Sequence, residues 1–241
     1  MPVSIKVIID AIDHPLYIKF IGWGISLLVG NDLLFDTFGN ARILKFMAKA
    51  KVGPKSIRQV FLSHQDPDHV GGLFAFLEKN PDVTVFACKS FTPEFKEKVK
   101  NTGARLVEVS GAPLEIRKNI FSSGEMTRMI KGKLVPEQAL VIKEGGNLTI
   151  LTGCAHPGLV RMVEEIKKSF GGKVKLLAGG FHFCDSKEPE VREALDALAA
   201  LGVEKVAPFH CTGKIAYKLF RKKYLKNYTK PRTGNIITLP H

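Results

Sequence analysis

The sequence predicts an α/β or α+β fold, and two patterns lead to this expectation. Short apolar runs typical of buried strands alternate with amphipathic or charged segments typical of helices. One strand, one helix and the next strand together take about thirty residues, which is the usual size of a β-α-β unit. The chain also has two strand-rich halves with helices between them, which indicates sheets stacked face to face with helices outside.

A length of 241 residues with 45% hydrophobic side chains suits one domain over residues 1–241 with a full apolar core. The first ten residues lack the features of a signal peptide, and no apolar run approaches the roughly 20 residues that cross a bilayer. We therefore expect a cytoplasmic protein that does not bind membranes. Because no cysteines have CxxC spacing, we interpret them as core residues or metal ligands rather than as disulfides. They are Cys88, Cys154, Cys184 and Cys211.

The net charge of +13 is uneven along the chain, because no Asp or Glu follows Glu204 while lysines and arginines accumulate there. Such a segment can attract an anionic substrate, a phosphate ester or RNA by long-range steering. The alternative is a solvated, lysine-rich face of a helix. We favour this alternative because runs of charge usually have that role.

The first half begins with strands over residues 3–9 and 24–29, and Asn31-Asp32 forms a hairpin turn into a strand that ends at Asp36. His14, between the first two strands, is interpreted as a structural residue or as part of a pocket rim. An amphipathic helix then stops before Gly53-Pro54. The segments expected from there are a helix over 41–51, a strand over 60–63, a helix over 73–79, a strand over 83–89, a helix over 93–102 and a strand over 104–110.

The second half begins with a charge-rich linker over residues 114–125. A hairpin over 139–152 turns at Gly145-Gly146-Asn147, and two further apolar strands end at His182 and His210. Of the seven histidines, five follow short apolar runs that are typical of strands, among them His64, His156, His182 and His210. Open sheets place ligand-binding groups at such strand ends, so these histidines are candidates for a site.

The junction after the strand at 60–63 concentrates metal-ligand types. His64, Asp66, Asp68 and His69 lie within six positions, just before a Gly-Gly pair. A single histidine at a strand end is more often structural or solvated, but burying two histidines and two aspartates here is costly without a cation. His64 and Asp66 point the same way in extended backbone, whereas a turn at Pro67 swings Asp68 and His69 toward another position. The motif therefore predicts two metals.

This pattern, H-x-D-x-D-H followed by G-G-L, resembles the H-x-H-x-D-H signature of the metallo-β-lactamase superfamily. Asp66 stands where most members have histidine, which is similar to the H-x-E-x-D-H of flavodiiron proteins. LLFDTFGN resembles the LFDTG that precedes this signature, in which the aspartate, here Asp36, supports the metal loop. The segments TGCAHPG, GGFHF, HCTG and SSGE resemble the dihydropterin-methyl-aminobenzene phosphate synthase-like branch of metal-dependent hydrolases.

The resemblance implies an αβ/βα four-layer sandwich, with two mixed sheets packed face to face and helices outside. It implies one metal held by His64 and Asp66, and a second held by Asp68, His69 and His210. Cys154 stands where most members have a bridging aspartate and some β-lactamases have a cysteine ligand, and His156 lies two residues further on. The implied metal ligands are His64, Asp66, Asp68, His69, Cys154, His156 and His210.

Two cations can bridge a water, lower its pKa and polarise the bond that the water attacks. In that chemistry Asp68 orients the water or accepts its proton, and His182 is a substrate-facing acid, an oxyanion-stabilising group or a further ligand. Cys184 and Cys211 are interpreted as packing residues. Two zinc ions suit the cysteine and the histidines, while Asp66 and Asp68 also suit iron or manganese.

Three functions follow from these expectations. We favour a metal-dependent hydrolase with a dinuclear site that acts on a small anionic substrate, for example one that bears phosphate. The second hypothesis is a phosphate-releasing synthase or transferase of the pterin branch, and the third is a di-iron redox or oxygen-binding protein like the flavodiiron core. Nucleic acid is not an expected partner, because residues 156–210 leave little room for a clamp domain. The sequence leaves the oligomeric state open.

Overall fold

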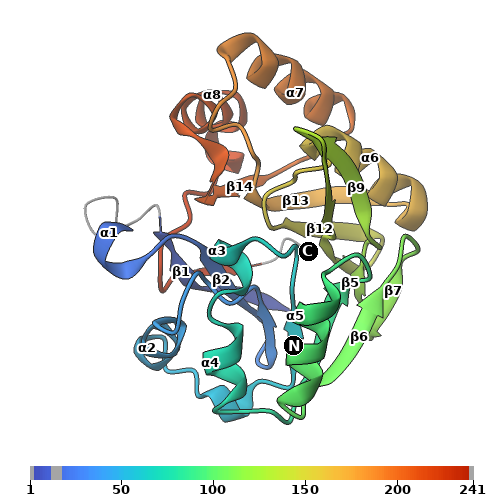
Figure 1. The fold of residues 1–241 in the computed structure, drawn as a ribbon. Helices are drawn as coiled ribbons and strands as arrows, with labels where there is room; N and C mark the ends of the chain where they lie inside the picture. Colours follow the sequence, from blue (N-terminus) through green and yellow to red (C-terminus); the bar gives the residue numbers. More distant parts are fainter. Residues whose placement is uncertain (1–2, 12–17, 239–241) are drawn as a thin grey trace. The chain divides into compact units, whose positions relative to one another are not determined.

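The computed structural model describes residues 3–11 and 18–238. Contacts divide the chain into two compact units, Met1–Ser110 with Arg232–Leu239, and Gly111–Pro231 with Pro240–His241. Each unit has its own main sheet (Figure 1), and each has its own apolar core. The expectation of one domain over residues 1–241 stays a prediction, and the roles predicted for His14 lie outside the described residues.

The first unit is built on a mixed, seven-stranded sheet in the order β15-β1-β2-β3-β4-β5-β6. Its strands are β1 (Ser4–Asp10), β2 (Ile25–Val29), β3 (Leu33–Phe35), β4 (Gln59–Phe61), β5 (Thr84–Cys88), β6 (Arg105–Val109) and β15 (Ile236–Thr238). Antiparallel pairing of β2 with β3 confirms the hairpin predicted at Asn31-Asp32. From β3 to β6 the neighbours run parallel, so the carboxyl ends of β3 and β4 lie at one edge of the sheet.

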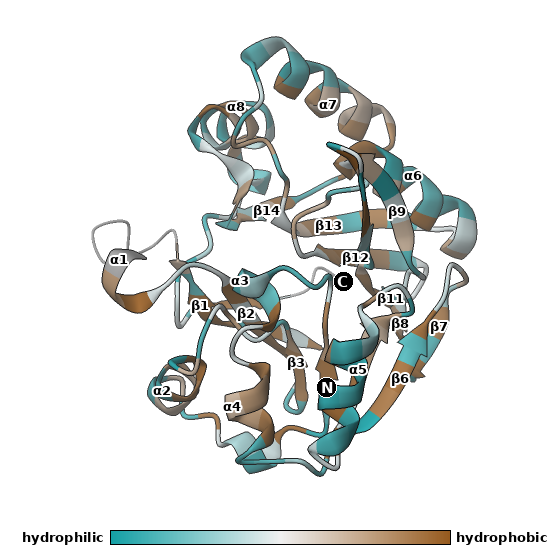
Figure 2. Ribbon diagram, in the orientation of Figure 1, coloured by the Kyte–Doolittle hydropathy of each residue, from teal (hydrophilic) through white to brown (hydrophobic). Residues whose placement is uncertain are grey.

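The helices of the first unit are short, and α2 and α4 pack apolar side chains against the core of this sheet. They are α1 (Ile18–Ile21), α2 (Ile43–Lys49), the 3-10 helix η2 (Pro54–Ser56), α3 (Pro67–Val70), α4 (Leu73–Leu77) and α5 (Pro93–Asn101). Phe46 and Met47 of α2 and Phe76 of α4 are buried in the same core as Leu34 and Val60 of the strands. Figure 2 shows α4 as largely apolar and α5 as largely hydrophilic, which agrees with the charged helix expected over 93–102.

The second unit has a mixed, six-stranded sheet in the order β14-β13-β12-β11-β8-β7, and a separate hairpin of β9 and β10. The strands are β7 (Leu114–Arg117), β8 (Ile120–Ser122), β9 (Met126–Ile130), β10 (Lys133–Glu137), β11 (Leu140–Glu144), β12 (Asn147–Thr152), β13 (Lys173–Gly180) and β14 (Val206–Phe209). β12, β13 and β14 run parallel. Their carboxyl ends therefore lie at one edge of the sheet.

The linker expected over residues 114–125 is wrong, because this segment contains the antiparallel pair β7–β8. Leu114, Ile116 and Ile120 supply a strand-like apolar pattern that the surrounding charges obscure. Asn119 adopts a left-handed conformation, with φ of 67°, and Asn tolerates this conformation better than most residues. The turn between the strands is therefore encoded locally. The predicted hairpin across Gly145-Gly146-Asn147 is confirmed as the pair β11–β12.

The helices of the second unit are longer and amphipathic. They are α6 (Leu159–Phe170), α7 (Glu188–Ala200) and α8 (Lys214–Tyr224), with 3-10 helices η3 (His210–Thr212) and η4 (Leu225–Asn227). α8 buries Ala216, Leu219, Phe220 and Tyr224, at the spacing of one helical face. The basic side chains of α8 and the residues after it are exposed, as expected of a solvated face. These residues are Lys214, Lys218, Arg221, Lys222, Lys223, Lys226 and Lys230.

None of the helices within residues 3–11 and 18–238 combines the length and the apolar composition needed to cross a membrane.

Candidate metal centre

The candidate ligands of the first unit and the residues that support them follow two neighbouring parallel strands. Asp36 comes directly after β3, and Ser63 and His64 come two and three residues after β4. The chain then enters α3 at Pro67. Proline suits the first helical position, because an N–H group there would have no hydrogen-bond partner within the helix. Asp68 and His69 lie within this one-turn helix. The predicted motif therefore occupies a strand end, a short loop and a helix start.

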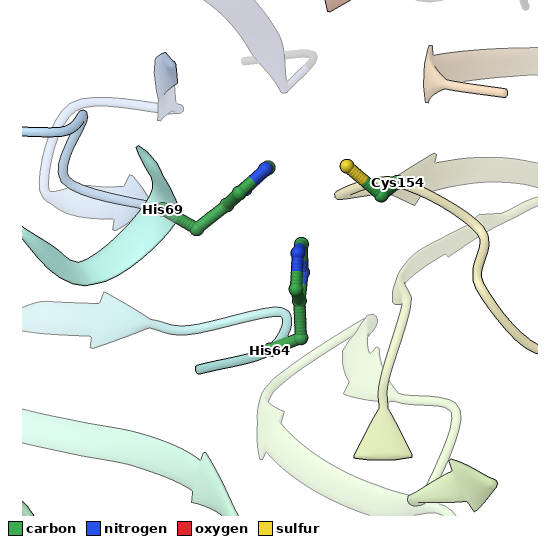
Figure 3. Close-up of side chains that lie close together, drawn as sticks. All are labelled: His64, His69 and Cys154. Atoms are coloured by element: carbon green, nitrogen blue, oxygen red, sulfur yellow. The ribbon is translucent and has the colours of Figure 1, made fainter. Parts of the chain in front are cut away.

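His64 and His69 are buried and lie side by side, with exposed fractions of 1% and 0% and ring centroids 4.0 Å apart. Figure 3 shows both imidazoles directed toward the same region. Each Nε2 has a carboxylate oxygen beside it: Asp66 Oδ2 lies 3.5 Å from Nε2 of His64, and Asp68 Oδ2 lies 3.4 Å from Nε2 of His69. The turn at Pro67 thus separates the two aspartates but keeps the two histidines adjacent.

Asp36 is a fully buried carboxylate that positions both histidines. Its Oδ1 accepts the backbone N–H of Ser63 at 2.8 Å, and its Oδ2 accepts the Ser63 hydroxyl at 2.7 Å. The same Oδ2 lies 2.6 Å from Nδ1 of His69, and Ser63 Oγ lies 2.9 Å from Nδ1 of His64. With the Ser63 hydroxyl donating to Asp36, both Nδ1 atoms act as donors and both Nε2 atoms keep lone pairs for a metal. These contacts agree with the supporting role expected of Asp36.

The charged groups around His69 favour a positive charge on its imidazole. Burial lowers the pKa of His69, but the charge and hydrogen bond of Asp36, with help from Asp68, raise that pKa well above its usual value. A buried imidazole that attracts a proton this strongly also suits a cation at Nε2.

Gly71 and Gly72 are needed for close packing rather than for an unusual backbone angle. Both adopt helical φ values, −63° and −87°. A Cβ atom on Gly71 would lie 2.2 Å from the carbonyl oxygen of Gly39, and one on Gly72 would lie 2.1 Å from that of Thr37. Thr37 also donates its hydroxyl to the carbonyl oxygen of His69 at 3.0 Å. The glycines therefore let α3 lie directly against the loop that carries Asp36.

In the second unit the candidate ligands follow the three parallel strands β12, β13 and β14. Cys154, drawn in Figure 3, and His156 come after β12, His182 after β13 and His210 after β14. Ligand atoms of Cys154, His156 and His182 lie within 4.8 Å of one another, and so do those of Cys154, His210 and Cys211. Parallel strands thus bring together residues that are up to 57 positions apart in the sequence.

Glu137, at the end of β10, was not predicted from the sequence. Its carboxylate is fully buried and holds the loop that carries Cys154 and His156. Oε1 accepts the backbone N–H groups of Gly153, Cys154 and Ala155 at 3.1, 2.9 and 2.7 Å. Oε2 lies 2.9 Å from both the backbone N and Nδ1 of His156. His156 is therefore held as His69 is, with Nε2 left for a metal.

His182 and Cys211 form a second polar pair in this unit. Burial raises the pKa of the Cys211 thiol, but hydrogen bonds from Cys154 and His182 and the charge of His210 lower it well below its usual value. The hydrogen bond to Cys211 raises the pKa of His182, although partial burial opposes the shift. The interpretation of Cys211 as a packing residue misses this polar contact. The same interpretation is wrong for Cys184, which is exposed.

Several of these loops hold non-glycine residues in left-handed backbone conformations. Asp36 and Phe38 in the first unit have φ values of 53° and 62°, and Ala155, His182 and His210 in the second have values of 62°, 54° and 47°. Each such residue costs about 1–3 kcal/mol and persists only where its surroundings fix it. Their concentration beside the candidate ligands supports a functional role for these loops.

The two sets of candidate ligands, each at the carboxyl end of parallel strands, are typical of a metal-binding α/β protein. A model of the metallo-beta-lactamase superfamily matches residues 26–210, and the chain belongs to this superfamily. The 7,8-dihydropterin-6-methyl-4-(beta-D-ribofuranosyl)-aminobenzene-5'-phosphate synthase of Methanocaldococcus jannaschii is 31% identical over 246 residues, covering 85% of this chain and 83% of the relative. The resemblance to that branch, inferred from the motifs, is confirmed.

Solved structures agree with this assignment. The structure of Tm1679, a metal-dependent hydrolase of the beta-lactamase superfamily, is 26% identical in sequence and aligns with a TM-score of 0.80. The alignment covers 99% of this chain and 100% of the Tm1679 chain. YhfI from Bacillus subtilis, a metallo-beta-lactamase fold protein, matches 98% of this chain over 99% of its own, with 14% identity and a TM-score of 0.69. The metallo-β-lactamase-like fold class predicted from the sequence is confirmed.

Proposed function

We propose that the chain is a metal-dependent hydrolase with a dinuclear centre, which uses water to cleave a small anionic substrate such as a phosphate ester. A repeated arrangement carries this proposal. His69 in the first unit and His156 in the second are each held at Nδ1 by a buried carboxylate, Asp36 or Glu137. A histidine held in this way offers Nε2 as a metal ligand. Each unit therefore supplies ligands of its own.

The donor atoms fit divalent metals. Histidine nitrogens and a thiolate suit zinc, and the carboxylates of the first unit also accept iron or manganese. The carboxylate of Asp36 is fully buried beside His64 and His69, and a cation bound there would compensate its negative charge. The residues that would hold metal are His64, Asp66, Asp68 and His69 of the first unit, and Cys154, His156 and His210 of the second.

Bound metals supply the activation of water and the polarisation of the bond under attack. Asp68 is the group that would orient this water and accept its proton, since its side chain is 24% exposed and its Oδ2 lies 3.4 Å from Nε2 of His69. His182 would donate a proton to the leaving group or stabilise developing negative charge. Its ring is 4.4 Å from that of His156, so it can reach a substrate atom beside this ligand.

The net charge of +13 favours an anionic substrate, because it raises the local concentration of anions around the protein. A phosphate-releasing synthase or transferase is the second candidate, since the 31% identical relative is a synthase whose product bears phosphate. Hydrolysis and synthesis differ in one measurable way. A hydrolase turns over with one substrate and water, whereas a synthase turns over only when a second organic substrate accepts the transferred group.

Metal content is the first test. Protein purified without added metal is analysed for zinc, iron and manganese per chain, and then assayed on panels of carboxylic and phosphate esters before and after chelation. Close to two zinc per chain, with activity lost on chelation and regained with zinc, supports the hydrolase. Close to two iron with visible absorption would instead support the di-iron protein. The synthase would be favoured if the protein turned over none of the substrates alone, but turned over a phosphorylated substrate when a dihydropterin was added.

Asp68→Asn tests the proposed role of the carboxylate in proton transfer. The substitution keeps the size of the side chain and removes its basicity, and general-base catalysis contributes about 10²–10⁴-fold, so kcat should fall within that range. Asp82→Asn is the matched control, because Asp82 is exposed in the loop before β5. Unchanged kcat in Asp68→Asn, with metal retained, would contradict the assigned role.

A further inference from the structure

Two cysteines and a histidine of the second unit form a compact group. The ligand atoms of Cys154, His210 and Cys211 all lie within 4.8 Å of one another. All three residues belong to the second unit. We propose that Cys211 is a direct metal ligand, which with Cys154 and His210 makes a two-thiolate site for a soft divalent ion such as zinc. This inference rests on the proposed metal dependence and names the donor that selects the metal.

The spacing is close to that of a zinc site. Zn–S bonds of about 2.3 Å and Zn–N bonds of about 2.0 Å in a tetrahedron place neighbouring ligand atoms about 3.5–3.8 Å apart. A group already confined within 4.8 Å needs only small side-chain movements to reach these separations. Cys154 also belongs to the group with His156 and His182. A fourth donor for the ion is therefore available from histidines on the same edge of the sheet.

The backbone around Cys211 is shaped to keep its thiol beside the Cys154 loop. Sγ of Cys211 lies 3.7 Å from the carbonyl oxygen of Cys154. A Cβ atom on Gly180 would lie 2.8 Å from this Sγ and 2.3 Å from the carbonyl oxygen of Gly153. The end of β13 must therefore be glycine for the thiol to occupy its place.

The turn that carries His210 and Cys211 is itself fixed. Thr212 Oγ1 donates to the carbonyl oxygen of Phe209 at 2.6 Å and accepts the backbone N–H of Phe181 at 3.3 Å. The hydroxyl of Tyr217 donates to the carbonyl oxygen of His210 at 3.2 Å. These contacts hold His210 in its left-handed conformation, with φ of 47°. Two adjacent donors, a nitrogen and a sulfur, are thereby presented from one turn.

Thiolates change which metal the protein selects. Carboxylate donors suit manganese, whereas two thiolates strongly favour zinc and other soft ions. Without a metal role, Cys211 would serve only as a hydrogen-bond partner of Cys154 and His182, and its removal would leave the metal's sulfur ligands unchanged. This difference separates the two roles of Cys211.

Cobalt(II) is the probe for the test, because each thiolate bound to cobalt adds to a charge-transfer band in the near ultraviolet. Wild type, Cys211→Ser, Cys154→Ser and the control Cys184→Ser are loaded with cobalt(II) under a phosphine reductant, and circular dichroism checks their folding. Cys184 is exposed and therefore serves as the matched thiol. We expect the band per chain to fall about twofold in Cys211→Ser and in Cys154→Ser, and to stay unchanged in Cys184→Ser. A full-intensity band in folded Cys211→Ser would overturn the proposal.

X-ray absorption of the zinc-loaded wild type gives a second readout that needs no variant. The proposal expects two sulfur neighbours per chain at about 2.3 Å from zinc. Once the sulfur count per zinc is multiplied by the measured zinc content, a total of one sulfur neighbour per chain or none would overturn it. In that case the proposed hydrolase function would still stand if the protein bound zinc and lost ester hydrolysis on chelation. A chain that binds no metal would overturn both proposals.

Discussion

Glu137→Gln keeps the size of the side chain and removes its charge, so it isolates the part that the buried carboxylate plays in the Cys154–His156 loop. A glutamine retains one acceptor oxygen for the three N–H groups that Oε1 accepts, and turns its NH₂ group toward His156. The backbone N–H of His156 then loses its acceptor. A buried unsatisfied donor costs about 1–3 kcal/mol, and each of the three remaining bonds loses about 1 kcal/mol without the charge.

Relief of the desolvation cost of a buried carboxylate offsets part of this loss. We therefore expect Glu137→Gln to lower the free energy of unfolding of the metal-free protein by about 2–4 kcal/mol. The NH₂ group would also donate to Nδ1 of His156, which moves the imidazole proton to Nε2 and occupies the nitrogen that a metal needs. Metal affinity should fall by about 10–100-fold, as is typical when a group that orients a metal-ligating histidine is removed.

Three measurements check this prediction. Denaturant unfolding of the chelated protein gives the change in stability, amide hydrogen exchange reports on residues 153–156, and competition with a chromophoric chelator gives the metal affinity. Glu164→Gln is the control, because Glu164 is exposed on α6. If Glu137→Gln matched this control in stability and in amide exchange, the carboxylate would not hold the loop, and the reasoning from its hydrogen bonds would fail.

Two further predictions concern the first unit. His64→Ala and His69→Ala should each lower the amount of bound metal more than Asp36→Ala does. The reason is that Asp36 contacts Ser63 and His69 and so supports the ligands without binding metal itself. Elemental analysis measures the bound metal, and equal loss in all three variants would indicate that Asp36 is a ligand. Gly72→Ala should destabilise the protein by about 1–3 kcal/mol, since its Cβ would lie 2.1 Å from the carbonyl oxygen of Thr37. Gly53→Ala, with nothing within 4 Å of its Cβ and a negative φ, is the thermal-unfolding control and should be close to neutral.

The candidate ligands could be proposed from the sequence because their signal is local. His64, His182 and His210 each follow a short apolar run, and parallel strands bring such ends together whatever their separation in the chain. Glu137 could not be predicted in this way. Its partners lie 16 to 19 residues further on, and its own surroundings, VPEQAL, show no pattern that distinguishes a buried carboxylate from an exposed one. Its role depends on how β10 and the end of β12 meet in the folded unit.

Gly71 and Gly72 are a second case in which contacts with a distant segment could not be predicted from the sequence. The sequence shows a Gly-Gly pair just after the candidate ligands, but it does not give the reason for glycine there. Their φ values are helical, and the requirement for glycine comes from the carbonyl oxygens of Gly39 and Thr37, more than thirty residues earlier. A residue's own backbone preference can be read from the sequence, whereas the atoms that approach it from another segment cannot.

The two units offer donors of different chemical hardness, and this difference bears on the metal. The first unit places carboxylate oxygens of Asp66 and Asp68 beside imidazole nitrogens, a set that iron, manganese and zinc all accept. The second places Cys154 and Cys211 beside His210, a set that manganese disfavours and zinc accepts readily. Zinc is the one of these three metals that suits both sets well. Selection for zinc over manganese would then come from the thiols of the second unit, while the first unit, through Asp36 and Asp68, would supply the hydrogen-bonded frame and the base.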